Sequence, residues 1–301
     1  MYIIHAHQYD AHFFCLKYRM FFNDFIHSQL LDQPHYLLIG NPVGHSVSPL
    51  MHNLALNYHN LNATYFSVSV EKSNLTQLAA HLNTSTFLGA NITIPYKEIL
   101  IPFMDELTTR AQNIGAINTI IKKGNLLVGE NTDVYGFNTP LHHIEELEPS
   151  RAIIFGTGGA TKAIIYALND FGFNEVCVVS RNPNSIIHNY HCTVCTYHNW
   201  QYFSEDASLI INATPLGMMP SIDTSPIKND EIEFLDGKIC YDIVYNPIET
   251  KFLQQAKKIN AMTIGGLEML IHQGDKSFFE WTGKGFPLPL VKTKLHEHFR
   301  V

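Results

Sequence analysis

The sequence predicts an α/β protein of two domains, and three observations indicate this class. The chain has 301 residues, 46% of them hydrophobic and 16% charged, which is enough to bury a core in each of two domains. Apolar runs alternate with helical segments between residues 36 and 94, as in a parallel sheet covered by helices. A second series, of strand, glycine turn and helix, begins at Arg151.

The first domain is predicted to contain strands at Tyr36–Ile39, Tyr65–Val70 and Phe87–Ile94. Helices are predicted between them, at 49–58 and 74–82. The predicted core of this domain therefore begins at Tyr36.

Residues 1–34 carry no predicted role. They are rich in histidine and aromatic residues, and they lack the basic start, apolar run and small-residue cleavage site of a signal peptide. The segment is either an early start assignment, with Met20 as one later start, or a real addition to the domain. We expect its deletion to leave activity within about twofold.

Two serine hydroxyls, those of Ser46 and Ser48, stand in a short turn ahead of a predicted helix whose first turn holds Pro49. The free N–H groups of that turn and the two hydroxyls would form a receptor for a small carboxylate. A helix-capping serine without a ligand is the alternative.

Three further polar motifs follow apolar runs. Asn91–Lys97 is a short strand stopped by proline, with Lys97 as a candidate proton donor just past the stop. Gly115–Thr119 comes next, and Gly129–Asp133 then opens a predicted helix. A solvent-exposed ion pair is the alternative for Lys97 and Asp133.

The second domain begins with the strand Ala152–Phe155, the turn Gly156–Ala160 and the helix Thr161–Phe171. Gly156 permits the tight turn, and Gly158 lets the backbone approach a pyrophosphate at the positive end of the helix. The general pattern has a third glycine that is absent here, so a purely structural turn is the alternative.

The next predicted strand, Glu175–Val179, ends in Ser180-Arg181-Asn182. An acidic residue at this point binds the ribose 2′-hydroxyl of NAD, whereas an arginine accommodates the 2′-phosphate of NADP. Arg181 therefore predicts NADP, with a solvated surface arginine as the alternative.

These motifs resemble the shikimate dehydrogenase family. The family pattern is matched as HSxSPxxHN at 45–53, NxTxPxK at 91–97, GAxNT at 115–119, GxNTD at 129–133 and GxGGAxxA at 156–163. Further matches at Asn212–Met218, Asp242–Pro247 and Gly265–Gln273 extend the resemblance over roughly residues 36–287.

The resemblance implies a parallel-sheet substrate domain, a Rossmann-type NADP-binding domain and a C-terminal helical return, with the active site in a cleft between the domains. The expected boundaries are 1–34 for the extension, 35–137 for the substrate domain, 138–264 for the NADP domain and 265–301 for the return.

The implied reaction is the reversible NADPH-dependent reduction of 3-dehydroshikimate to shikimate, a step of chorismate and aromatic amino-acid biosynthesis. Lys97 and Asp133 match the catalytic pair of the family. The matched substrate-binding residues are Ser46, Ser48, Thr93, Asn118, Tyr245 and Gln273. The matched cofactor residues are Gly156, Gly158, Gly159, Ala160, Ser180, Arg181, Asn182, Thr214, Gly266 and Met269. The second basic residue that the family places after Arg181 is Ser185 here.

Two other functions are compatible with these motifs. Quinate and aminoshikimate dehydrogenases share the fold and the catalytic pair, and the two serines favour shikimate. A non-catalytic sensor is the second alternative, which the intact Lys97 and Asp133 oppose.

Composition excludes several classes of partner. A net charge of −7 without a long basic run argues against nucleic acid, and no apolar run approaches the ~20 residues that span a bilayer. Five cysteines, an odd number, indicate reduced thiols in the cytoplasm. We expect a monomer or homodimer that binds small molecules.

The segment His188–His198 superficially offers zinc ligands. However, Cys192–Tyr197 is β-branched and aromatic, and alternate residues of a strand face opposite sides. An ordinary strand is therefore expected, and no metal site.

Overall fold

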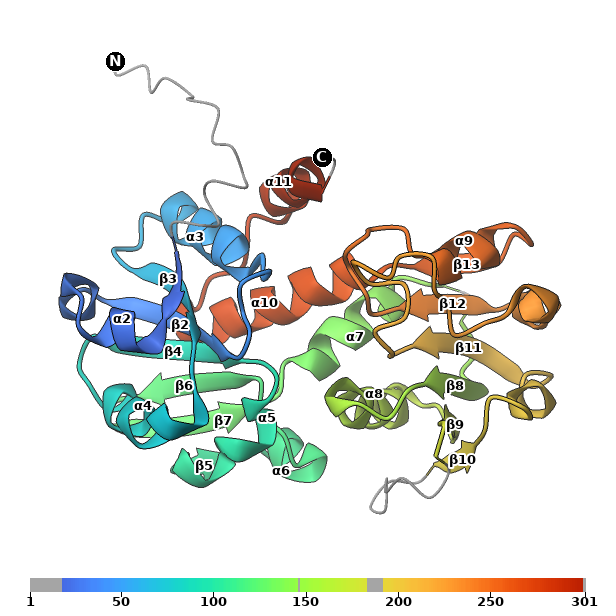
Figure 1. Ribbon diagram of the computed structural model, residues 1–301, viewed down its shortest axis with the longest axis horizontal. Helices are drawn as coiled ribbons and strands as arrows, with labels where there is room; N and C mark the ends of the chain where they lie inside the picture. Colours follow the sequence, from blue (N-terminus) through green and yellow to red (C-terminus); the bar gives the residue numbers. More distant parts are fainter. Residues whose placement is uncertain (1–17, 146, 183–191, 300–301) are drawn as a thin grey trace. The chain divides into compact units, whose positions relative to one another are not determined.

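The computed structural model describes residues 18–145, 147–182 and 192–299, and its chain divides into two compact units (Figure 1). The first unit joins residues 1–131 to 274–301, and the second contains residues 132–273. The sequence-based domain boundaries, at 137/138 and 264/265, stay predictions. Within the described ranges, no helix combines the length and the apolarity that crossing a bilayer requires.

The first unit is built on a seven-stranded sheet of order β1-β3-β2-β4-β6-β7-β5. Its strands are β1 (Arg19–Phe21), β2 (His35–Gly40), β3 (Thr64–Ser69), β4 (Phe87–Ile92), β5 (Glu106–Leu107), β6 (Thr119–Lys123) and β7 (Leu126–Glu130). β1 to β4 are mutually parallel, as the alternation of strands and helices predicts, and β6 runs antiparallel to β4 and β7.

The first unit also contains helices and 3-10 turns. They are α2 (Phe22–Ile26), η1 (Gln29–Asp32), α3 (Ser48–Tyr58), η2 (Lys72–Asn74), α4 (Leu75–Leu82), α5 (Tyr96–Ile99), η3 (Ile101–Phe103), α6 (Thr109–Ile114) and α11 (Leu288–Phe299). α3 and α4 confirm the two helices predicted for this region, apart from small shifts at their ends.

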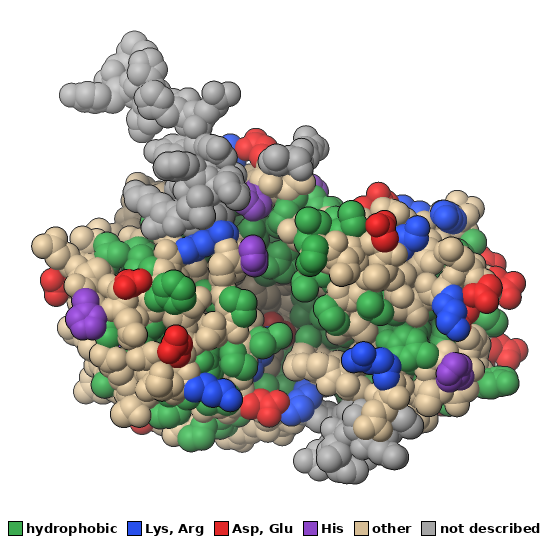
Figure 2. Space-filling view, in the orientation of Figure 1, with side chains coloured by type: hydrophobic (Ala, Val, Ile, Leu, Met, Phe, Trp, Pro, Cys, Tyr) green, Lys and Arg blue, Asp and Glu red, His purple; other side chains and the backbone are tan. Residues whose placement is uncertain are grey.

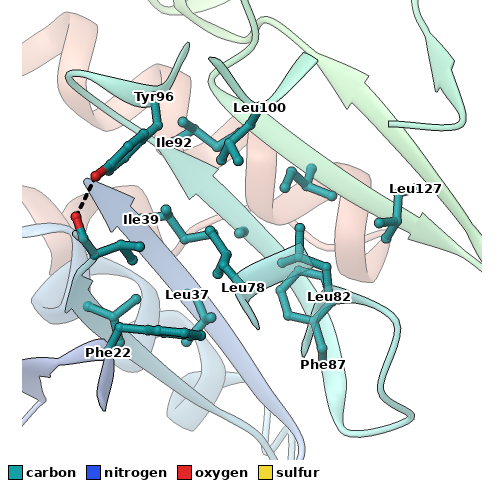
Figure 3. Close-up of a cluster of buried hydrophobic side chains, with 14 of the residues drawn as sticks. Phe22, Leu37, Ile39, Leu78, Leu82, Phe87, Ile92, Tyr96, Leu100 and Leu127 are labelled. Carbon is teal, nitrogen blue, oxygen red and sulfur yellow. Dashed lines mark hydrogen bonds between the residues drawn. The ribbon is translucent and has the colours of Figure 1, made fainter. Parts of the chain in front are cut away.

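Alternation along β2 separates the two faces of this sheet. Leu37 and Ile39 point into an apolar cluster with Phe22 and Leu78 (Figure 3). Tyr36 faces the other side, where its ring stacks on Trp281 with 4.7 Å between centroids.

The expectation that the core begins at Tyr36 is wrong. β1 pairs in parallel with β3, and Phe22 and Phe25 of α2 are 1% and 0% exposed. The first core residues therefore lie inside the segment to which the sequence assigned no role, so its deletion would remove part of the sheet and its covering.

The second unit is a six-stranded parallel sheet of order β10-β9-β8-β11-β12-β13. Its strands are β8 (Arg151–Phe155), β9 (Glu175–Val179), β10 (Thr193–Cys195), β11 (Ala207–Asn212), β12 (Ile239–Asp242) and β13 (Met262–Ile264). Counted from β8, this order is 3-2-1-4-5-6, the order of a Rossmann dinucleotide-binding sheet. The predicted fold class is confirmed.

The helices and 3-10 turns of this unit are α7 (Asp133–His142), α8 (Gly159–Phe171), η4 (Trp200–Phe203), η5 (Asn229–Leu235) and α9 (Lys251–Lys257). One further helix, α10 (Gly266–Thr282), has residues in both units. β10 confirms the strand expected around Cys195, whereas His188 and His191 lie outside the described residues.

Candidate active site

The structure brings the two predicted carboxylate-binding serines together. The Ser46 hydroxyl donates to the Ser48 hydroxyl over 3.1 Å and accepts from the Ser48 backbone N–H, also over 3.1 Å. Ser48 is the first residue of α3, and Pro49 follows it in the first turn. The turn therefore presents two hydroxyls at a helix N-terminus, which is suited to an anion.

An arginine that the sequence reasoning missed holds this turn. Arg19 of β1 donates from Nη2 to the backbone carbonyl of Ser46 over 3.2 Å. The N-terminal segment therefore contacts the serine turn directly. No sequence signal indicates this contact, because it arises from the pairing of β1 with β3.

Backbone hydrogen bonds place Lys97 beside the segment that carries Asn118. Lys97 lies in α5, directly after the end of β4, and its carbonyl accepts from the N–H of Ile117 over 2.8 Å. The N–H of Thr93 donates to the Ile39 carbonyl over 2.9 Å at the end of β2. Thr93 and Lys97 therefore follow β4, and Asn118 directly precedes β6, which pairs antiparallel with β4.

In the second unit, a glycine brings two helices that carry predicted site residues into close contact. Asp133 starts α7 and is 7% exposed. A Cβ placed on Gly136, one turn later, would lie 2.6 Å from the Met269 carbonyl oxygen and 2.7 Å from Cβ of Gln273. α7 and α10 therefore approach each other at Gly136. Because Lys97 belongs to the other unit, its pairing with Asp133 stays a prediction.

A buried carboxylate shapes the loops of Thr214 and Tyr245. Asp242, at the end of β12, accepts from Asn212 Nδ2 over 3.0 Å and from the Val244 N–H over 2.9 Å. Burial raises the pKa of Asp242 to about 6, and the hydrogen bonds it accepts oppose this rise. Asn212 in turn accepts from the Thr214 hydroxyl over 2.6 Å. The sequence places Asp242 in a family motif but does not indicate that its carboxylate organises these two loops.

The glycine turn has the form that the sequence predicts. Gly156 has φ +111°, and a Cβ there would lie 2.9 Å from the Ala213 carbonyl oxygen. A Cβ on Gly158 or Gly159 would meet no atom within 4 Å, and α8 begins at Gly159, next to Ala160. The turn therefore leaves an open approach to the N-terminus of a 13-residue helix, which suits a pyrophosphate.

Gly158→Ala and Gly156→Ala should separate binding from folding. Gly158→Ala should fold normally, because its methyl group meets no protein atom, and should lower NADP affinity about tenfold or more, because that group occupies the backbone approach. Gly156→Ala should lower the free energy of unfolding by about 1–3 kcal/mol through its positive φ and close contact. Urea unfolding measures the free energy of unfolding of each variant, and NADP titration measures its affinity for NADP. Unchanged NADP binding in Gly158→Ala would remove the pyrophosphate from this turn.

The end of β9 carries the predicted ribose-phosphate residues. The Ser180 hydroxyl accepts from the Asn182 N–H over 3.1 Å and donates to the Asn182 carbonyl over 2.8 Å, which closes a tight turn. Arg181 is exposed at its tip. Gly156, at the end of β8, donates its N–H to Val179 of β9 over 3.0 Å, so both turns lie on adjacent strand ends.

The remaining predicted cofactor residues lie on α10. Gly266 begins this helix, and a Cβ there would lie 2.3 Å from the Ile243 carbonyl oxygen. Met269 follows within the first turn and is buried. The strand order, the open glycine turn and the exposed Arg181 together fit a bound NADP. On the described surface that Figure 2 shows, basic and acidic side chains are interspersed rather than gathered into one basic patch.

Known proteins are similar to this chain over most of its length. The sequence model of the shikimate dehydrogenase substrate binding domain matches residues 38–120. A shikimate dehydrogenase (NADP(+)) from Trichormus variabilis is 36% identical over 275 residues, which cover 87% of this chain and 95% of that protein. The chain belongs to the shikimate dehydrogenase family.

Solved structures of the family extend the similarity to the fold. A shikimate dehydrogenase in complex with NADP+ matches with a TM-score of 0.81 and 31% identity, over 90% of this chain and 97% of the other. The enzyme from Thermus thermophilus, in complex with NADP(H) and shikimate, matches with a TM-score of 0.79 and 29% identity, over 88% and 99%.

Proposed function

We propose that the protein catalyses the reversible NADPH-dependent reduction of 3-dehydroshikimate to shikimate, a step of chorismate and aromatic amino-acid biosynthesis. The observation that carries this proposal is the 36% identity to an NADP-dependent shikimate dehydrogenase over 87% of the chain. The paired hydroxyls of Ser46 and Ser48 and the Rossmann strand order support it independently. We place the enzyme in the cytoplasm, as a monomer or homodimer.

The proposed roles follow from the chemistry of ketone reduction. NADPH supplies a hydride, and the substrate oxygen then needs a proton. The Lys97 ammonium stabilises the developing negative charge on that oxygen and donates the proton. Asp133 accepts a hydrogen bond from the same hydroxyl and holds the Lys97 ammonium.

The remaining polar residues bind and orient the ring. Thr93, Asn118 and Gln273 hydrogen-bond its other hydroxyls. Ser46, Ser48 and Tyr245 hold its carboxylate, which is charged at neutral pH and needs donors around it.

The test is NADP reduction measured with shikimate and quinate side by side. We expect a higher kcat/KM with shikimate. A higher value with quinate would reassign the enzyme to quinate, and no turnover with either, together with measurable binding, would favour the non-catalytic sensor.

Arg181→Ala should remove most of the preference for NADP over NAD. Arg181 is the basic residue at the end of β9, and a single charge-assisted hydrogen bond contributes about 1.5–3 kcal/mol. The wild-type preference should therefore be about one to two orders of magnitude. Kinetics with both cofactors measure it, and the NAD values of the same variant serve as the control. A wild-type enzyme that favours NAD would overturn this role of Arg181.

A further inference from the structure

The N-terminal strand β1 brings an arginine to the serine turn. β1 pairs in parallel with β3, with Arg19 in register with Ser67, and the Ser67 N–H donates to the Tyr18 carbonyl over 2.8 Å. Tyr18 and Met20 pack against the apolar cluster on one face of the sheet. Because alternate residues of a strand face opposite sides, the side chain of Arg19 points to the other face.

Helix α3 packs on that other face, beside β3. His52 of α3 stacks on Tyr65 of β3 with 4.2 Å between ring centroids, and Tyr65 and Ser67 are alternate residues of the same strand. Arg19 therefore points to the face of the sheet on which α3 lies, and α3 begins at Ser48.

Arg19 restrains the peptide unit between the two serines. Its Nη2 donates to the Ser46 carbonyl over 3.2 Å, and the Ser46 N–H donates to the Val43 carbonyl, also over 3.2 Å. Because a peptide unit is planar, a bond to its carbonyl restrains the whole unit from Ser46 to Val47. The Ser46 hydroxyl in turn bonds the hydroxyl and the N–H of Ser48. The relative orientation of the two hydroxyls therefore depends on Arg19.

The charge of the guanidinium strengthens this restraint. Arginine stays protonated in proteins, and among the described residues none of the ion pairs includes Arg19. A hydrogen bond from a charged donor is roughly twice as strong as one from a neutral donor. Within the same part of the chain, the Nε of Arg19 is buried without an acceptor, so the bond from Nη2 to Ser46 is the polar contact that directs this side chain.

Resting on the proposed function, we propose that Arg19 is a positioning residue for the substrate carboxylate, whose guanidinium holds the peptide between Ser46 and Ser48 so that both hydroxyls bind the same carboxylate. Arg19 acts through Ser46 and makes no contact with the reacting atoms. It precedes residue 38, where the match to the substrate-binding-domain model begins. The N-terminal segment of this chain thus contributes to a site whose other residues lie in the matched domain or after it.

Arg19→Met tests this, because methionine keeps an unbranched side chain and removes the donor. KM for shikimate should rise roughly fivefold to twentyfold, about the effect of losing one hydrogen bond to a charged group. The change in kcat should stay within about twofold, because carboxylate contacts act as uniform binding. KM for NADP should also stay within about twofold, since the NADP residues belong to the other unit.

Phe21→Met is the matched control. Phe21 lies two residues along β1, on the same face as Arg19, and is 65% exposed. Its KM for shikimate should stay within about twofold of wild type, and urea unfolding of both variants shows whether β1 is retained. An equal rise in the two variants, or a rise for both substrates in Arg19→Met, would show a general effect of β1 and overturn the proposal. An unchanged KM in Arg19→Met would also overturn it.

A double-mutant cycle with Ser46→Ala tests whether Arg19 acts through the serine. Arg19→Met should raise KM for shikimate by a factor at least twofold smaller in the Ser46→Ala background than in the wild type, because the hydroxyl that Arg19 positions is already absent. Fully additive effects would contradict the positioning role.

A crystal structure of Arg19→Met gives a readout independent of activity. We expect the Ser46 carbonyl to turn from its wild-type orientation and the 3.1 Å distance between the two serine hydroxyls to change. A serine turn that superposes on that of the wild type would overturn the proposal, whatever the substrate. In contrast, a wild-type enzyme without shikimate turnover would contradict the proposed function and leave this structural outcome to decide the role of Arg19.

Discussion

Lys97→Ala should lower kcat for shikimate oxidation by roughly two to four orders of magnitude, the usual contribution of a positioned proton donor or acceptor. Lys97 lies in α5 directly after β4, and its carbonyl is fixed by the N–H of Ile117. Alanine keeps this backbone bond while removing the ammonium. The variant should therefore keep the fold and bind NADP like the wild type.

Steady-state kinetics, NADP titration and urea unfolding of the same preparation measure these three properties. Lys123→Ala, which removes an exposed lysine at the end of β6, is the matched control and should leave kcat unchanged. A kcat of Lys97→Ala within about threefold of wild type would remove Lys97 from the mechanism.

The parts of the fold that the sequence predicts are those that local rules determine. The strand, glycine turn and helix from Arg151 to Phe171 were predictable because Gly156 needs a positive φ and the helix has one apolar face. The serine turn was predictable because Pro49 marks the first turn of a helix.

The remaining features arise from contacts between distant segments. Gly136 allows α7 and α10 to meet, but a glycine within a predicted helix does not indicate its partner. Tyr65 lies in an apolar strand, where a tyrosine is ordinarily a core residue, so its hydrogen bond to Asn91 could not be foreseen. β1 has three residues, too few to show a period of two.

Phe25→Ala should destabilise the first unit by about 3–5 kcal/mol, the usual effect of truncating a fully buried phenylalanine. Phe25 is 0% exposed, and its ring centroid lies 5.6 Å from that of Phe66, 5.2 Å from His35 and 5.5 Å from His81. Phe25, in the segment to which the sequence assigned no role, thus packs against a buried pair of histidines. The two histidines face each other with 2.9 Å between their Nε2 atoms.

The histidine pair gives this prediction a second measurement. The pKa of His81 is lowered to about 4, mainly by burial and to a smaller extent by the neighbouring His35 and Lys122. Loss of the Phe25 ring should expose His81 to water and raise its pKa toward about 6.5. NMR titration of the variant measures this pKa. Phe21→Ala is the control, because Phe21 is 65% exposed and its loss should change the free energy of unfolding by less than about 0.5 kcal/mol. If Phe25→Ala unfolds at the same urea concentration as Phe21→Ala, the Phe25 ring does not stabilise the core of the first unit.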